Sequence, residues 1–298
     1  MFDDFFLISF VPLMTGIFSA LSCTLVGNFL ILRKQAMLSD TISHVVLPGI
    51  VISYYFFGSL GSNVMLFGAL GAGLVAAFTI SFLQSQTKMD SSAAMAITLS
   101  VFFAAGVLMI ELSAGGNIHL DVEHALYGNL ESLIWIDGND FASIFDPIAR
   151  QSIPIELFRS LAGFLVILLL IIIFWRPLVV TTFDETFAQV SGIFISLVSG
   201  GIAVAATIAA IVSFDAVGSI IVVAMFICPP AAARVLTDKL FPQMVLSLIF
   251  AALAATLGYS IAGYLPIALG FDTSISAAGT IATLSGLILA IAMISSKR

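Results

Sequence analysis

The chain has 298 residues, of which 60% are hydrophobic and only 9% are charged, and its mean hydropathy is +1.18. Soluble globular proteins carry about 25% charged residues, so this composition excludes a soluble globular domain and indicates a polytopic membrane protein. The net charge of −7 comes almost entirely from loop residues and identifies no partner, and a nucleic-acid partner is not expected.

Apolar segments of about 17–25 residues, the length that a bilayer requires, follow one another along the chain. The predicted spans are residues 6–32, 40–58, 62–84, 91–111, 157–175, 190–212, 216–236, 242–264 and 273–294. They predict an all-α fold of about nine transmembrane helices in a single domain over residues 1–298, with an outer loop at about 112–156. The first residues lack the basic start of a signal peptide, so we expect the first apolar run to be an uncleaved span.

The basic residues set the predicted orientation. With the N-terminus outside and the C-terminus inside, only Arg150 and Arg159 fall on the outer side, and the other eight of the ten basic residues fall on the cytoplasmic side. The outer loop is acidic. It serves either as a vestibule that concentrates cations or simply as a soluble loop.

Asp40 and His44 form the most informative pair in the chain. Their i, i+4 spacing places both side chains on one face of a helix, one turn apart, and inside the membrane if that helix begins near Ala36. Ionisable residues in spans are costly, and a carboxylate beside an imidazole suits a divalent metal ion. The alternative is a structural hydrogen bond between the two side chains. Pro48 and Gly49 follow and predict a helix break that frees carbonyl ligands.

A cytoplasmic segment at about 182–192 predicts a short amphipathic helix. Thr182 and Glu185 fit a capping box, and Gly192 marks an end or a break. Phe183, Phe187 and Val190 form an apolar stripe, which either lies on the membrane or docks on a partner.

Two further features are ambiguous. Pro229 and Pro230 interrupt a span, as a structural kink, a hinge or a break that lines a path. In the outer loop, a group of four residues is either a weak metal-collecting site or a solvated polar turn: His119, Asp121, Glu123 and His124.

Several catalytic motifs are absent from the sequence. None of the four lysines follows a glycine, so there is no Gly-Lys-Ser/Thr phosphate loop, and ATP-driven transport needs another chain to hydrolyse ATP. There is no Cys-x-x-Cys, His-Glu-x-x-His or Gly-x-Ser-x-Gly motif either. We therefore expect a transport subunit rather than an enzyme.

Together these segments resemble the permease subunits of metal-cation ABC importers, which take up manganese, zinc or ferrous iron. The family's Gly-Asp-Ala-Leu-Ser-His-Ala-Val-Leu-Pro-Gly is similar to residues 39–49, and its Phe-Asp-Pro-Glu-x-Ala to residues 183–188, without the proline. Its Val-Gly-x-Leu-Leu-Val-Val-Ala and Pro-Ala-Ala-Thr-Ala-Arg resemble residues 217–224 and 230–234. Asp90 and Tyr127-Gly128-Asn129 also fit, so the resemblance covers nearly the whole chain in order.

The resemblance implies the importer fold of the cobalamin and iron-siderophore permeases, in a bacterial cytoplasmic membrane. It implies a second permease chain, identical or related, so that two Asp40/His44 pairs hold the metal. It also implies a cytoplasmic ATPase and an extracytoplasmic metal-binding protein. The segment that docks on the ATPase would include Thr182, Phe183, Asp184, Glu185, Phe187, Ala188 and Gly192.

The sequence therefore predicts the permease of an ATP-driven importer of Mn²⁺, Zn²⁺ or Fe²⁺, with the transported ion and no permanently bound cofactor. The alternative is a stand-alone secondary carrier or channel, which needs proton-coupling carboxylates in several spans. Asp40 is the only acid deep in a span, whereas Glu111 and Asp215 lie near the ends. A membrane hydrolase is disfavoured because the catalytic motifs are missing.

Overall fold

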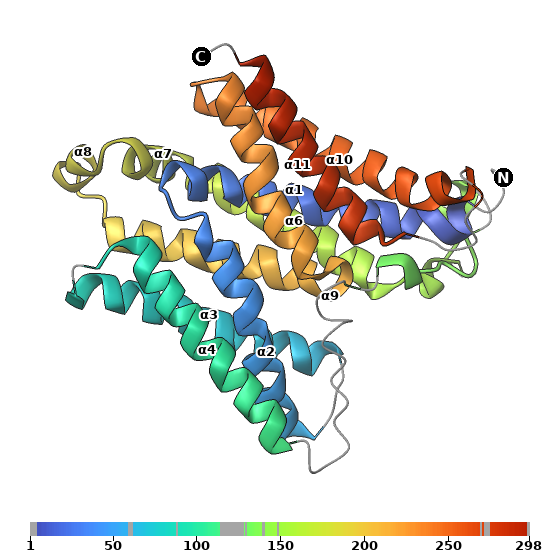
Figure 1. Cartoon of the computed structure of the whole chain (residues 1–298), viewed down its shortest axis with the longest axis horizontal. Coiled ribbons are helices and arrows are strands. Elements are labelled where there is room, and N and C mark those ends of the chain that lie inside the picture. Colours follow the sequence, from blue (N-terminus) through green and yellow to red (C-terminus); the bar gives the residue numbers. More distant parts are fainter. Residues whose placement is uncertain are drawn as a thin grey trace. The chain divides into compact units, whose positions relative to one another are not determined.

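A computed structural model describes residues 5–58, 62–87, 89–113, 128, 130–138, 141–147, 149–268, 270 and 275–296. Over these ranges the chain is helical and contains no β-strand (Figure 1), which confirms the predicted all-α fold. The α-helices are α1 (Val11–Leu32), α2 (Met37–Phe57), α3 (Ser62–Thr87), α4 (Ser91–Ser113), α6 (Ile155–Ile173), α7 (Trp175–Phe183), α8 (Glu185–Val190), α9 (Ile195–Leu236), α10 (Leu240–Ala268) and α11 (Ala277–Ser295). The π-helix η1 (Phe5–Phe10) precedes α1, and the 3₁₀-helices are η2 (Leu130–Ser132), η3 (Phe141–Ile144) and η4 (Ala149–Ser152).

Nine segments of the described chain are long and apolar enough to cross a bilayer, and they follow the predicted spans in order. The helix α9 carries two of them, Ile195–Phe214 and Ala216–Leu236. Many large apolar side chains on these segments are exposed, which suits helices that face lipid rather than water. The chain is therefore a multi-pass membrane protein. Its predicted orientation, with the N-terminus outside, stays a prediction.

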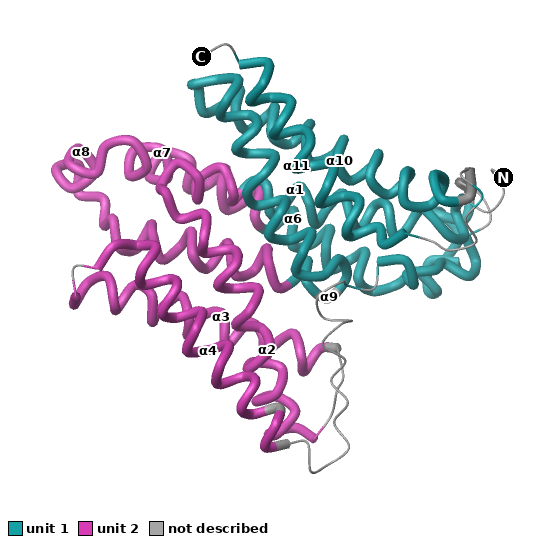
Figure 2. Tube along the Cα trace, viewed as in Figure 1, with its two compact units in different colours: residues 1–25, 123–166, 212–298 teal, residues 26–122, 167–211 magenta. Residues whose placement is uncertain are grey.

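The chain forms two compact units (Figure 2). We call residues 26–122 and 167–211 the α2 unit, and residues 1–25, 123–166 and 212–298 the α10 unit. Each unit is assembled from segments that are distant in the sequence.

In the α2 unit, α2 packs against α3 and α4 through glycines. A Cβ atom built on Gly49 would lie 2.5 Å from the carbonyl oxygen of Gly68, and one built on Gly106 would lie 2.8 Å from Cδ of Pro48. Small residues at such crossings let the backbones of membrane helices approach closely. The position of α2, which carries the predicted metal pair, therefore depends on these glycines.

In the α10 unit, α10 packs against α11, and η2 of the predicted outer loop contacts α11. Thr280 of α11 donates a hydrogen bond to the Gly258 carbonyl of α10 at 3.0 Å. In the loop, the buried Trp135 indole donates from Nε1 to the Ala149 carbonyl at 2.7 Å, and the Glu131 carboxylate accepts from the Ala277 amide at 2.6 Å. An acidic side chain at this position caps the start of α11. The described residues of the predicted loop, 128, 130–138, 141–147 and 149–154, lie between the end of α4 at Ser113 and the start of α6 at Ile155.

The structure shows no interruption of the helices at the prolines, and a kink or hinge there stays a prediction. The helix α2 continues through Pro48 and Gly49, and α9 continues through Pro229 and Pro230. Proline at position 229 cannot donate to the carbonyl four residues earlier, and the Thr24 hydroxyl donates to that Met225 carbonyl at 3.0 Å instead. A buried hydroxyl from another helix thus satisfies the freed acceptor and lets the helix continue.

The break in α9 occurs at Gly218, whose φ of 76° and ψ of 169° are not helical. Gly128 of the outer loop, with φ of 72°, lies against it, and a Cβ atom on Gly128 would overlap the Gly218 amide nitrogen. A residue with a side chain could adopt neither the positive φ nor this close approach without strain. Both positions therefore require glycine.

Candidate functional site

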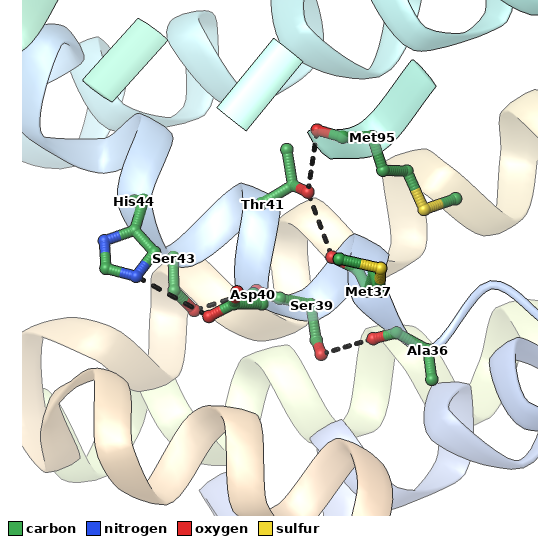
Figure 3. A network of polar contacts seen from close by, with 8 residues as sticks. All are labelled: Ala36, Met37, Ser39, Asp40, Thr41, Ser43, His44 and Met95. Atoms are coloured by element: carbon green, nitrogen blue, oxygen red, sulfur yellow. Dashed lines mark hydrogen bonds and ion pairs between the residues drawn. The ribbon is translucent and has the colours of Figure 1, made fainter. Parts of the chain in front are cut away.

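The site is built on the first turns of α2 (Figure 3). The helix begins at Met37, close to the predicted start near Ala36, so Asp40 lies in its first turn and His44 one turn later. The two side chains point toward one another, with 3.5 Å between His44 Nε2 and Asp40 Oδ1. The prediction that both lie on one face of a membrane span is confirmed.

The pair is open rather than sealed in the core. The Asp40 side chain is 42% exposed and that of His44 is 33% exposed. On its other side, the His44 ring contacts the Phe103 ring of α4 edge to face, with the ring centroids 5.5 Å apart and the planes at 82°. Phe103 thus limits the orientations of the imidazole, while Asp40 and His44 stay accessible to an ion.

The neighbouring hydroxyls are committed to the backbone of the helix. Ser39 donates to the Ala36 carbonyl at 2.9 Å, and Ser43 donates to that of Ser39 at 2.9 Å. Thr41 donates to its own helix and lies 3.4 Å from the Met95 carbonyl of α4 (Figure 3). All three side chains are buried, which makes them poor candidates for further ligands, and the Thr41 contact ties α2 to α4.

The described residues of one chain offer only part of a candidate metal site. No group of three or more His, Cys, Asp or Glu side chains capable of holding a metal occurs among the described residues. Zn²⁺ takes four ligands in closed sites and Mn²⁺ favours octahedral coordination. Farther along α2, a hollow of about 500 Å³ between α2, α3 and α4 is lined by apolar groups and Ser53, whose hydroxyl donates to the Ile50 carbonyl. The apolar lining of that hollow provides few ligands for a cation. A metal ion held by Asp40 and His44 therefore needs further ligands from outside this hollow.

The four predicted vestibule residues, His119, Asp121, Glu123 and His124, lie outside the described residues. A role for them in collecting metal ions stays a prediction.

The predicted amphipathic helix exists as α8, but its cap differs from the prediction. Asp184 is extended and its Oδ1 accepts from the Phe187 amide at 2.8 Å, so Asp184 is the N-cap. Thr182 belongs to α7, and its hydroxyl donates to the Leu178 carbonyl at 2.6 Å and accepts from Arg33. The predicted capping box of Thr182 and Glu185 is wrong because Thr182 lies inside α7, which ends at Phe183, and so cannot be the N-cap of α8.

The end of α8 follows the predicted role of Gly192. Gly192 has φ of 75°, its amide donates to the Gln189 carbonyl, and the Ile193 amide donates to the Ala188 carbonyl. This pair of bonds is a Schellman motif, which ends a helix sharply at a left-handed residue. The direction of α8 relative to the start of α9 is fixed by it.

The surface of α8 is strongly apolar. Of the predicted stripe, Phe187 and Val190 lie on α8 and are 57% and 84% exposed, whereas Phe183, 54% exposed, is the last residue of α7. Ala188 is fully buried, so it supports α8 and cannot itself touch a partner. Sequence reasoning missed Phe194, which is 78% exposed just after the Schellman turn. The signal available in the sequence was the position of Phe194, two residues after Gly192.

Comparison with known proteins identifies the family. The model of the ABC 3 transport family matches residues 7–150 and 151–296. The chain belongs to the ABC 3 transport family. Among curated relatives, the manganese transport system membrane protein MntD of Bacillus subtilis is 36% identical over 283 residues, covering 95% of this chain and 90% of MntD. The zinc transport system membrane protein TroD of Treponema pallidum is 34% identical over 279 residues, covering 94% of this chain and 71% of TroD.

Solved structures of ABC transporters share the fold. PsaBC from Streptococcus pneumoniae, solved in complex with a Fab, is 28% identical with a TM-score of 0.73, covering 96% of this chain and 91% of the PsaBC chain. A metal-chelate type ABC transporter in an inward-facing conformation is 14% identical with a TM-score of 0.70, covering 98% of this chain and 87% of that one. The second likeness concerns the fold alone. The predicted importer fold is confirmed.

Proposed function

We propose that this chain is the membrane permease of an ATP-driven importer of divalent transition-metal ions, with Mn²⁺ or Zn²⁺ favoured and Fe²⁺ a further candidate. The observation that carries the proposal is the Asp40–His44 pair, facing one another at 3.5 Å and partly exposed within a span. Neutral imidazole suits Zn²⁺ and carboxylate suits Mn²⁺, so a mixed pair accepts either ion. The relatives that are named as manganese and zinc transport proteins support the same class of substrate.

The metal site is completed by a second permease chain, identical or related. Two copies of the pair related by a twofold or pseudo-twofold axis supply two carboxylates and two imidazoles. This arrangement supplies more ligands than one chain does, because the described residues include no group of three His, Cys, Asp or Glu side chains that could hold a metal. An extracytoplasmic binding protein delivers the ion to the outer face, and the pair binds it after it has entered a path that is open outward.

A cytoplasmic ATPase drives the cycle through α8. The exposed stripe of Phe183, Phe187 and Val190 suits insertion of a short helix into an apolar groove of a partner. ATP binding and hydrolysis in that partner change access to the pair, and release requires that the two states hold the ligands in different geometries.

Uptake assays test this function directly. Cells that lack their own importers express this chain with its ATPase and binding protein, and accumulation of Mn²⁺, Zn²⁺ and Fe²⁺ is measured. We expect ATP-dependent accumulation of at least one ion, and its loss in Asp40→Asn and in His44→Ala at matched membrane levels. Ser43→Ala is the matched control, because the Ser43 hydroxyl lies in the same turn but bonds to its own helix.

Two outcomes would contradict the proposal. Normal uptake in both site variants would make the pair structural and move the path elsewhere. Uptake that persists without the ATPase would favour a stand-alone secondary carrier.

A further inference from the structure

Arg33 follows the last residue of α1 and joins three helices of the α2 unit. Its Nε donates to the Thr182 hydroxyl at 3.1 Å and its Nη2 to the Thr181 hydroxyl at 2.5 Å, both on α7. Its Nη1 donates to the Ser199 hydroxyl at 2.8 Å, in the second turn of α9. All three nitrogens of one guanidinium are thus directed at hydroxyls on the two helices that flank α8.

The two threonine hydroxyls are prepared as acceptors. Thr181 donates its proton to the Pro177 carbonyl at 2.7 Å, and Thr182 donates to the Leu178 carbonyl at 2.6 Å. A hydroxyl has one proton and two lone pairs, so each oxygen keeps a lone pair for the guanidinium. The planar guanidinium of arginine donates to both hydroxyls at once from fixed directions, and the single ammonium of lysine cannot reproduce this geometry.

The charge of Arg33 also relates it to α8. Burial lowers the pKa of the Arg33 guanidinium, and attraction to the carboxylate of Glu185, the first residue of α8, partly opposes this effect. Arginine stays protonated in proteins. A half-buried positive charge is therefore held among hydroxyls, near the acidic start of α8.

On the other side, Arg33 is connected to the metal pair through a short, hydrogen-bonded turn. Lys34 has φ of 58°, its amide donates to the Ile31 carbonyl, and the Gln35 amide donates to the Leu30 carbonyl, which forms a second Schellman motif. The Leu38 amide then donates to the Gln35 carbonyl, so α2 begins directly from this turn. Asp40 lies in that first turn of α2.

We propose that Arg33 is the positioning residue that links α8 to the Asp40–His44 pair, so that movement of α7 and α8 against the ATPase is transmitted to the first turn of α2. The inference rests on the proposed function, and it adds a residue that touches neither the metal nor the partner.

The test uses the complex of both permease chains and the ATPase in proteoliposomes, with the binding protein added for the uptake measurement. Three quantities are measured: equilibrium binding of the ion without nucleotide, ATP hydrolysis, and uptake per ATP hydrolysed. The ion is whichever of Mn²⁺, Zn²⁺ or Fe²⁺ the wild type accumulates. The variants are Arg33→Gln, Arg33→Lys and Thr181→Val, and Lys34→Gln is the matched control because it removes the same charge from the adjacent, exposed residue.

We expect Arg33→Gln to bind the ion within twofold of wild type and to retain the ATPase, while uptake per ATP falls at least tenfold. Arg33→Lys should be intermediate, and Lys34→Gln should match wild type. Combining Arg33→Gln with Thr181→Val should cost little more than Arg33→Gln alone, since both remove the same contact.

Uptake per ATP within twofold of wild type in Arg33→Gln would overturn the proposal. So would parallel loss of ion binding and ATPase retention, because that pattern describes a residue needed only for folding. If the wild type accumulates none of the three ions, the proposed function fails, and the role of Arg33 fails with it.

Discussion

Gly68 of α3 offers a stringent test of how closely α2 must be held. A Cβ atom added there would lie 2.5 Å from Ser53 Cβ and 2.6 Å from Ser53 Oγ, and it would also overlap the Gly49 carbonyl oxygen. Carbon atoms in contact prefer about 3.5–4.0 Å, so the new methyl group is about 1 Å too close. The Ser53 hydroxyl can rotate away, but its Cβ atom and the Gly49 backbone cannot. Gly68→Ala must therefore push α2 and α3 apart.

The magnitude follows from a comparison with Gly71 of the same helix, where an added Cβ atom would meet nothing within 4 Å. Both substitutions gain about 0.8–1 kcal/mol of helix propensity, which cancels between them. Overpacking costs about 1–3 kcal/mol, so Gly68→Ala should be less stable than Gly71→Ala by that amount. Because α2 carries Asp40 and His44, Gly68→Ala should also weaken metal binding.

The assay is thermal unfolding of the two purified variants in the same detergent, with equilibrium metal binding as a second measurement. We expect a melting temperature several degrees lower for Gly68→Ala and an unchanged or raised value for Gly71→Ala. Equal melting temperatures would refute the close approach of α2 and α3 at this crossing. Normal metal binding in a destabilised Gly68→Ala would show that the pair does not depend on this packing.

Three further results are expected. Thr24→Val leaves the buried Met225 carbonyl without its partner and should cost about 1–3 kcal/mol in thermal unfolding, whereas Thr79→Val, an exposed hydroxyl bonded to its own helix, should not. Asp184→Ala removes the N-cap of α8, which destabilises that helix by about 1 kcal/mol, and it should weaken co-purification of the ATPase. Unchanged recovery of the ATPase would argue against docking through an ordered α8. Phe187→Glu should release the ATPase while ion binding persists, and a retained ATPase would show that the stripe faces lipid instead.

The prolines show why some local patterns mislead. Pro229 does remove a backbone hydrogen bond, as its chemistry predicts, yet the helix continues because Thr24, about 200 residues away in the chain, meets the free carbonyl. The actual break occurs at Gly218, where Gly128 of the outer loop approaches the backbone. Neither partner can be found by inspecting the residues around the break.

The capping of α8 gives the same lesson at shorter range. Thr182 and Glu185 have the spacing of a capping box, but α7 and Arg33 both engage the Thr182 hydroxyl. Asp184 caps the helix instead. The hydroxyl of Thr182 forms hydrogen bonds with the groups that the tertiary structure places next to it, and sequence spacing alone does not reveal those groups.

By itself the sequence determined the number and order of the spans, because an apolar segment in a bilayer must satisfy its backbone hydrogen bonds internally and so must be helical. It also determined that Asp40 and His44 lie close together, since residues four apart on a helix are neighbours in any fold. Only the tertiary structure decided the break at Gly218, the burial of Ala188, and the connection of Arg33 to α7 and α9. These depend on contacts between segments distant in the chain, and no local pattern records such contacts.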